Sequence, residues 1–105
     1  MENTWKAGTW TLVSDEWSLI TSGGDKLHLT AKEYSFLNCL ALTPKGIVSR
    51  DSILNVLAYE HNENGNRSLE SLVYRLRKKI SPTLDTPIKN TNVSGYSFEA
   101  LIQLE

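Results

Sequence analysis

RSLESLVYRLRKKI, the segment from Arg67 to Ile80, has the residue spacing of an amphipathic helix with one apolar and one cationic face. Its apolar residues recur at helical intervals of three and four, which places them on one stripe that should face a hydrophobic core. These residues are Leu69, Leu72, Val73, Leu76 and Ile80. Opposite the stripe lie Arg67, Ser71, Tyr74 and Lys78, with Arg75 and Lys79 on one flank and Glu70 and Arg77 on the other. Taken alone, such a helix is more often a solvated surface helix than a binding element.

Positive charge is concentrated in this segment, although the whole chain has a net charge of −1 at pH 7. Between Arg67 and Lys79 there are five basic residues and one acidic residue, a local charge of +4, whereas the rest of the chain carries −5. This segregation directs a positive field from one element and limits indiscriminate binding elsewhere. A nucleic-acid phosphate backbone is the commonest target of such a patch, and an acidic protein surface is the alternative.

The length of 105 residues, without a long linker, predicts one domain over residues 1–105 with a single core. No apolar run approaches about 18 residues and no secretion signal is present, so no membrane span or leader is expected within the sequence. The single cysteine, Cys39, excludes an internal disulfide and fits a reducing cytosol. Without paired carboxylates, a metal-ligand cluster or a phosphate loop, the sequence indicates neither an enzyme nor a cofactor, metal or small-molecule substrate.

The first third of the chain alternates between apolar and polar residues, as short β-strands do. We expect strands in Thr9–Val13, Trp17–Thr21 and Lys26–Leu29, joined by turns into an antiparallel meander over residues 9–29. The three tryptophans should cover the helices rather than stack on bases, because few basic residues are interleaved with them.

Two further helices are predicted before the basic segment. Thr30 followed by Glu33 forms a capping box, which predicts a helix from Ala31 to about Leu42. Ser49 is the next N-cap, for a helix that extends to about Ala58. The residues expected to face the core are Phe36, Leu37, Leu40, Ile53, Leu54 and Leu57.

Two charged residues, Glu33 and Arg50, project onto the apolar faces of these two helices. A lone buried charge is costly, whereas a carboxylate and a guanidinium can satisfy each other in a bidentate pair. One expectation is therefore a Glu33–Arg50 ion pair that locks the two helices together. The alternative, equally weighted, is that Glu33 only completes the capping box while Arg50 extends to solvent.

The remaining segments complete the order of elements. The polar run His61–Asn66 predicts a loop before the basic helix, with Asn66 or Ser68 as the N-cap of that helix, so that three helices occupy residues 30–81. Pro87–Asn92 and Tyr96–Leu101 are two extended segments of a hairpin, residues 87–101, whose Gly95 can take a positive φ. A sheet, two helices, a basic helix and a hairpin form an α+β winged helix-turn-helix, in which the last helix enters the DNA major groove.

Four segments of the sequence resemble the OmpR/PhoB-type winged-helix DNA-binding domain, the effector part of many bacterial response regulators in two-component phosphorelay systems. They are LHLTAKEYSFLNCL (Leu27–Leu40), GIVSRDSIL (Gly46–Leu54), RSLESLVYRLRKKI (Arg67–Ile80) and SGYSF (Ser94–Phe98). The resemblance implies an N-terminal four-stranded sheet, three helices and a C-terminal hairpin wing. It also implies a cytoplasmic transcription regulator that binds specific double-stranded DNA, usually as a dimer on tandem sites.

The resemblance also assigns site residues. It implies DNA contacts by Arg67, Arg75 and Arg77, and by Thr30 at a helix N-terminus close to a phosphate. The helical projection adds Ser71, Tyr74 and Lys78. A guanidinium suits a guanine edge or a phosphate, and we rank Arg75 above the flanking Arg77 for base contact. The loop that touches RNA polymerase in this family corresponds to Glu60, His61, Asn62, Glu63, Asn64, Gly65 and Asn66.

Two positions depart from the family pattern. Asn92 stands where many members carry a wing arginine for the minor groove, so wing contact should be weaker and made through Asn92 and Ser94. Ala58 stands where an aromatic residue often ends the second helix, although Tyr59 follows it.

Two other hypotheses remain. A winged helix can act as a protein-interaction module that docks its basic face on an acidic partner, which the acidic pI and the missing wing arginine favour. The second hypothesis follows from the sequence containing no receiver domain. The chain could be the DNA-binding domain that precedes a membrane anchor in ToxR- or CadC-like regulators.

Overall fold

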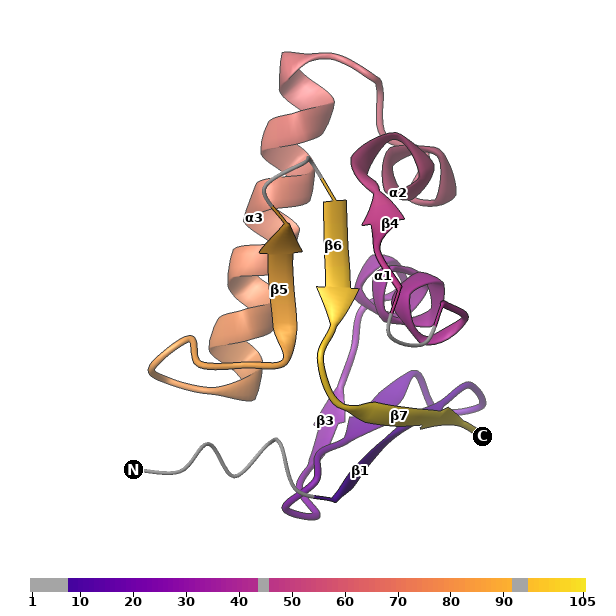
Figure 1. Cartoon of the computed structure of the whole chain (residues 1–105), viewed down its shortest axis with the longest axis vertical. Coiled ribbons are helices and arrows are strands. Elements are labelled where there is room, and N and C mark those ends of the chain that lie inside the picture. The colour runs from indigo at the N-terminus through magenta and orange to yellow at the C-terminus, as the bar shows by residue number, and fades with distance from the viewer. Residues whose placement is uncertain (1–7, 44–45, 92–94) are drawn as a thin grey trace.

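The computed structural model describes residues 8–43, 46–91 and 95–105 and has an α+β order of strands, helices and strands (Figure 1). Its elements are β1 (Thr9–Val13), β2 (Ser18–Ile20), β3 (Lys26–His28), α1 (Ala31–Ala41), β4 (Val48–Ser49), α2 (Arg50–Val56), α3 (Glu63–Ile80), β5 (Ile88–Thr91), β6 (Gly95–Phe98) and β7 (Leu101–Leu104). This order confirms the winged helix-turn-helix expected from the sequence.

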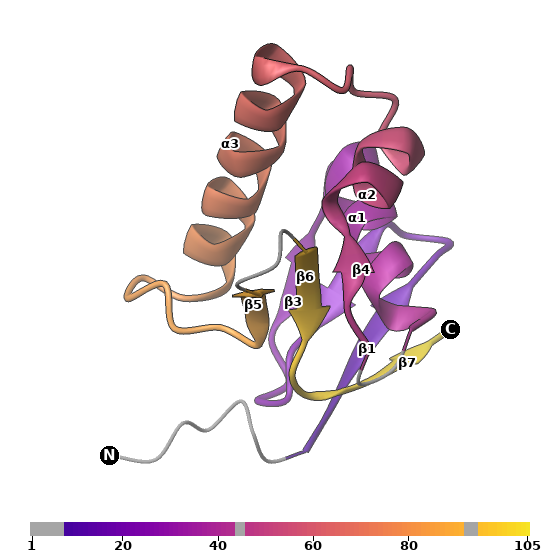
Figure 2. The same cartoon turned by 45° about the horizontal axis from the view of Figure 1, so that its top comes forward.

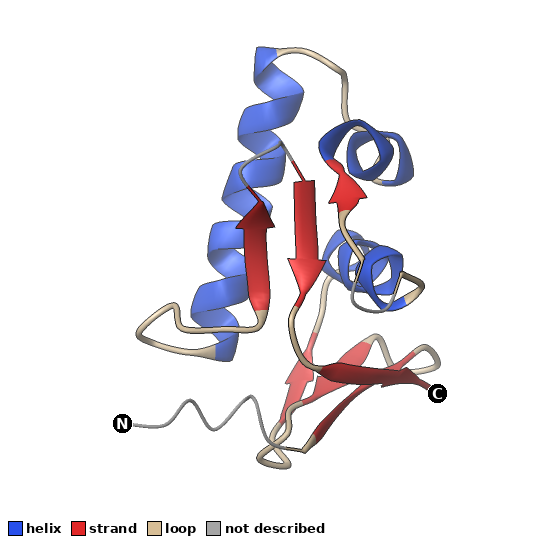
Figure 3. Ribbon diagram, viewed as in Figure 1, coloured by secondary structure: helices blue, strands red, loops and turns tan. Residues whose placement is uncertain are grey.

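A four-stranded sheet lies at one end of the molecule, beneath the helices (Figure 3). Its strand order is β3-β2-β1-β7, with the expected antiparallel meander of β1 to β3. The fourth strand is the C-terminal β7, which pairs in parallel with β1 so that Leu12 faces Leu104. The expectation that all four strands come from the N-terminal part is therefore wrong for the described residues.

The second sheet carries the wing and has the order β4-β6-β5. Strands β5 and β6 form the expected antiparallel hairpin, in which Asn90 faces Tyr96. The hairpin ends at Phe98 rather than at Leu101, because the chain bends there and leaves to form β7. Gly95 has no positive φ, contrary to expectation. Glycine is required there by space, since a Cβ would lie 2.8 Å from the backbone carbonyl oxygen of Val48.

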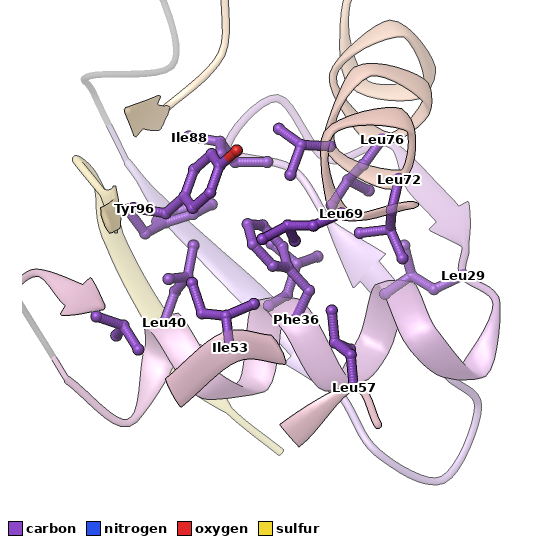
Figure 4. Close-up of a cluster of buried hydrophobic side chains, with 14 of the residues drawn as sticks. Leu29, Phe36, Leu40, Ile53, Leu57, Leu69, Leu72, Leu76, Ile88 and Tyr96 are labelled. Carbon is purple, nitrogen blue, oxygen red and sulfur yellow. The ribbon is translucent and has the colours of Figure 1, made fainter. Parts of the chain in front are cut away.

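The hydrophobic core fills the space between the helices and the two sheets (Figure 4). The apolar stripe of α3 enters it, since Leu69, Leu72, Val73 and Leu76 are buried. Phe36 of α1 and Tyr96 of β6 meet edge to face, with ring centroids 5.5 Å apart. The buried side chains of α3 belong to the same cluster as this ring pair, so α3 is packed against α1 and the wing.

The tryptophans behave differently from one another. Trp10 is buried and packs edge to face on Phe98, as expected of a residue that covers the core. Trp17 is 49% exposed and has a φ of 47°, so it ends a turn and the strand begins only at Ser18. The expected start of this strand at Trp17 is therefore wrong, and Trp5 lies outside the described residues.

The caps of α1 and α2 are those expected. The Glu33 amide donates to Oγ1 of Thr30 at 3.2 Å, and the Thr30 amide donates to the Glu33 carboxylate at 2.9 Å, which completes the capping box. Ser49 caps α2, because its hydroxyl accepts from the amide of Ser52 at 3.2 Å.

Helix α3 begins at Glu63, one turn before the expected start at Arg67. Its N-cap is Asn62, whose Oδ1 accepts from the amide of Gly65 at 2.9 Å, and not Asn66 or Ser68. At Gly65 an added Cβ would lie 1.7 Å from the carbonyl oxygen of Glu60. The first turn of α3 thus packs directly on the preceding backbone, so most of the segment predicted as a loop is helical.

Candidate nucleic-acid interface

Helix α3 runs along one side of the molecule and leaves its outward face uncovered by other elements (Figure 2). Its apolar side is buried, whereas its opposite side is exposed along more than two turns. We call this exposed set the basic face of α3; its members are Arg67, Ser71, Tyr74, Arg75 and Lys78. All five were expected as DNA contacts, and the structure brings them together on one surface.

Two shallow hollows flank a ridge on this face formed by Arg67, Ser71 and Arg75. The first, of about 460 Å³, is bordered by the ridge together with Glu70 and Tyr74. The second, of about 290 Å³, is bordered by the ridge together with Tyr59 and Ser68. Guanidinium groups among hydroxyl groups can bind phosphate oxygens or the acceptor edge of a base.

Three residues of these hollows were not among the sequence-predicted contacts: Tyr59, Ser68 and Glu70. The helical projection placed Glu70 on a flank and did not treat Ser68 as part of the face. Both neighbour the ridge at helical spacing, a signal that the sequence did contain. Tyr59 precedes the helix and reaches the ridge only through the path of the α2–α3 connection, so periodicity within α3 could not find it.

The ion pair between Arg67 and Glu63 is weak enough to be exchanged for a contact with DNA. Arg67 Nη2 lies 3.0 Å from Oε1 of Glu63, but both side chains are more than two-thirds exposed. Such an exposed pair contributes little to stability, and its guanidinium can turn to a phosphate at little cost. Lys78 lies beside Tyr74, with its Nζ 3.4 Å from the phenol oxygen.

Arg77 differs from its neighbours because it holds the wing. Its Nη2 donates to the carbonyl oxygen of Ile88 at 2.9 Å and to Oδ1 of Asn90 at 2.8 Å. Burial lowers the pKa of the Arg77 guanidinium, although the group remains a cation at neutral pH. The structure therefore joins Arg77, expected to contact DNA from the flank of the helix, to strand β5.

The predicted Glu33–Arg50 ion pair is wrong. Lys79 forms the ion pair with Glu33 instead, with its Nζ 2.7 Å from Oε1 of Glu33. The same Nζ donates to the carbonyl oxygen of His28 at 3.0 Å. Arg50 turns to α3, where its Nη1 lies 3.2 Å from Oδ1 of Asn66 and 3.6 Å from Oε2 of Glu70. Both charges find partners on α3, because this helix packs against α1 and α2 together.

The other expected site residues lie at the edges of the interface. Thr30 is exposed at the N-terminus of α1, where its hydroxyl caps the helix. Asn92 and Ser94 fall outside the described residues. In the segment expected to meet RNA polymerase, five residues are exposed, whereas Gly65 is buried and Asn66 is partly buried against Arg50. The exposed five are Glu60, His61, Asn62, Glu63 and Asn64.

Within residues 8–43, 46–91 and 95–105, no helix is long and apolar enough to cross a membrane. The same residues contain no group of three or more His, Cys, Asp or Glu side chains that could hold a metal ion.

Residues 24–98 match the family model described as "Transcriptional regulatory protein, C terminal". The chain belongs to this family of OmpR/PhoB-type DNA-binding domains. Members of this family regulate transcription by binding DNA, and the family is not a class of enzymes. Strands β1 and β7, which pair with each other, lie outside the matched residues.

Similar proteins support the family assignment. Regulatory protein VirG of Rhizobium rhizogenes is 33% identical over 93 residues, which cover 87% of this chain and 39% of VirG. The chain thus spans well under half the length of this curated relative. The DNA-binding domain of Klebsiella pneumoniae RstA, solved in complex with the RstA box, is 29% identical with a TM-score of 0.62 over 77% of this chain and 81% of that one.

A second solved structure shares the fold. The DNA-binding domain of Bacillus subtilis CssR has a TM-score of 0.66 and 24% identity, and the match covers 84% of this chain and 97% of that one. Most of the family's fold is therefore present in this chain, even where few residues are identical.

Proposed function

We propose that this chain is the effector part of a bacterial two-component response regulator and binds a specific duplex DNA sequence with α3 in the major groove. The observation that supports this most directly is the division of α3 into a buried apolar side and the exposed basic face. A major groove about 12 Å wide admits one such helix. The RstA domain, which was solved with its DNA box, supports the same role by similarity.

Each residue of the interface has a role set by its chemistry. Arg75 is exposed and free to meet the acceptor edge of a guanine, whereas Lys78 suits a phosphate. Thr30 lies at the N-terminus of α1, where amide groups and the helix dipole favour an anion. Arg77 has a positioning role: its hydrogen bonds to Ile88 and Asn90 hold the wing at a fixed distance from α3.

Two substitutions test these roles on a site selected from random duplexes. Arg75→Ala should weaken binding to that site by about 1 to 3 kcal/mol and relax the preference at one base pair. Lys78→Ala should weaken all sequences alike and reduce the slope of log K against log salt by about 1. Lys26→Ala, on β3 and paired with Glu16, is the matched control and should bind like the wild type. If Arg75→Ala binds its selected site as the wild type does, α3 is not the reader.

Further partners follow from the same proposal. The family resemblance points to RNA polymerase as a partner of the exposed residues Glu60 to Asn64, to dimers on tandem DNA sites and to a cytoplasmic location. Replacing Glu60 and Asn64 with alanine should lower promoter-driven transcription while leaving DNA affinity unchanged, because neither residue lies on the basic face. Equal transcription in the variant and the wild type would rule out this contact surface. Dimer formation should appear as cooperative binding to two tandem half-sites but not to one.

A further inference from the structure

Tyr74 is the one large apolar side chain among the described residues of the basic face, and it is 50% exposed. The other members of this face are two arginines, a lysine and a serine, which need water or an ionic partner. An aromatic ring gains free energy by leaving water, so a ring held half exposed here is suited to covering an apolar group on a partner.

Lys78 lies beside the hydroxyl end of this ring. Its Nζ lies 3.4 Å from the Tyr74 hydroxyl and 5.6 Å from the ring centroid, one turn further along the helix. The contact occupies the polar end of the side chain and leaves ring surface beside the hollow of about 460 Å³. Arg67, Ser71 and Arg75 border the same hollow, so the ring lies among the groups suited to base edges and phosphates.

The major-groove edge of DNA offers one prominent apolar group, the C5-methyl of thymine. Guanine, adenine and cytosine present hydrogen-bond donors and acceptors there. We propose that Tyr74 is a specificity-determining residue that recognises a thymine by packing its ring on this methyl group. The inference rests on the proposed insertion of α3 into the major groove and adds which base one of its residues selects.

Deoxyuridine scanning tests this contact. The preferred duplex is first selected from a random library with the wild-type protein, and each thymine is then replaced singly by deoxyuridine, which removes only the methyl group. At one position the wild type should bind roughly fourfold more weakly, the effect of one apolar carbon left in water. Tyr74→Ser should show no response at that position and keep its responses elsewhere. Tyr74→Phe, which keeps the ring without the hydroxyl, should respond like the wild type.

The outcomes separate the inference from the function on which it rests. Equal responses of the wild type and Tyr74→Ser to every deoxyuridine would overturn the thymine contact. So would loss of the response in Tyr74→Phe, because the hydroxyl rather than the ring would then be the contact. A library from which no sequence is enriched would instead reject the proposed reading by α3, and the inference with it. Because Tyr74 is outside the core, the wild type, Tyr74→Ser and Tyr74→Phe should have similar melting temperatures.

Discussion

Lys79 and Glu33 join the last turn of α3 to the first turn of α1, with 2.7 Å between Nζ and Oε1. The Glu33 side chain is only 6% exposed and also accepts from the Thr30 amide. One carboxylate therefore completes the cap of α1 and anchors the basic helix. The orientation of α3 depends on a residue that lies in another helix and cannot itself face DNA.

Lys79→Gln should destabilise the fold by about 1 to 3 kcal/mol, because it leaves the Glu33 carboxylate buried without its cation. Lys79 is about one-third exposed, so this loss should be smaller than that for a fully buried pair. Urea denaturation measures the change. Lys78→Gln is the matched control, since Lys78 is exposed and donates to the hydroxyl of Tyr74 on the same helix rather than to another element of the fold. Equal stability of the two variants would contradict the anchoring role.

Gly65→Ala should destabilise the protein by more than about 2 kcal/mol, since the new Cβ would lie 1.7 Å from the Glu60 carbonyl oxygen and force the first turn of α3 to move. Gly23→Ala is the control, because the nearest atom to its Cβ would be Oγ1 of Thr21 at an ordinary 3.8 Å. Thermal melting of both variants measures the difference. If Gly65→Ala and Gly23→Ala have the same melting temperature, α3 does not pack on the Glu60 backbone.

Arg77→Lys should loosen the wing while keeping the positive charge. A lysine cannot reproduce the planar fork that donates to both Ile88 and Asn90. The backbone amides of β5 should exchange with deuterium about tenfold faster, a change of roughly 1.4 kcal/mol in opening free energy. Arg75→Lys, on the exposed face of the same helix, should leave this exchange unchanged. Unaltered exchange in Arg77→Lys would show that the wing does not depend on the guanidinium.

Features encoded by nearby residues were predictable from the sequence. The capping box of Thr30 and Glu33, the Ser49 cap and the apolar stripe of α3 each arise from spacings of three or four residues. The order of these elements then indicated the winged helix. The helical projection placed Arg67, Ser71, Tyr74 and Lys78 on the basic face, and the family resemblance added Arg75.

Features that depend on distant residues were not predictable in this way. The pairing of β7 with β1 joins the two ends of the described chain, and nothing in either strand specifies its partner. The partner of Glu33 lies 46 residues further along the chain, and the sequence could not show that Lys79 rather than Arg50 takes this position. The early start of α3 depends on the approach of Gly65 to Glu60, which overrides the turn-forming character of the polar run.

The position of α3 on DNA can be measured directly by nuclear magnetic resonance. Adding the selected duplex to isotope-labelled protein should shift or broaden the backbone amide signals between Arg67 and Lys78, with smaller changes near Thr30. The signals of β1 and β7, neighbouring strands of the sheet at one end of the molecule, should stay in place. Shifts confined to those strands, with the α3 signals unchanged, would contradict the account that α3 reads the DNA.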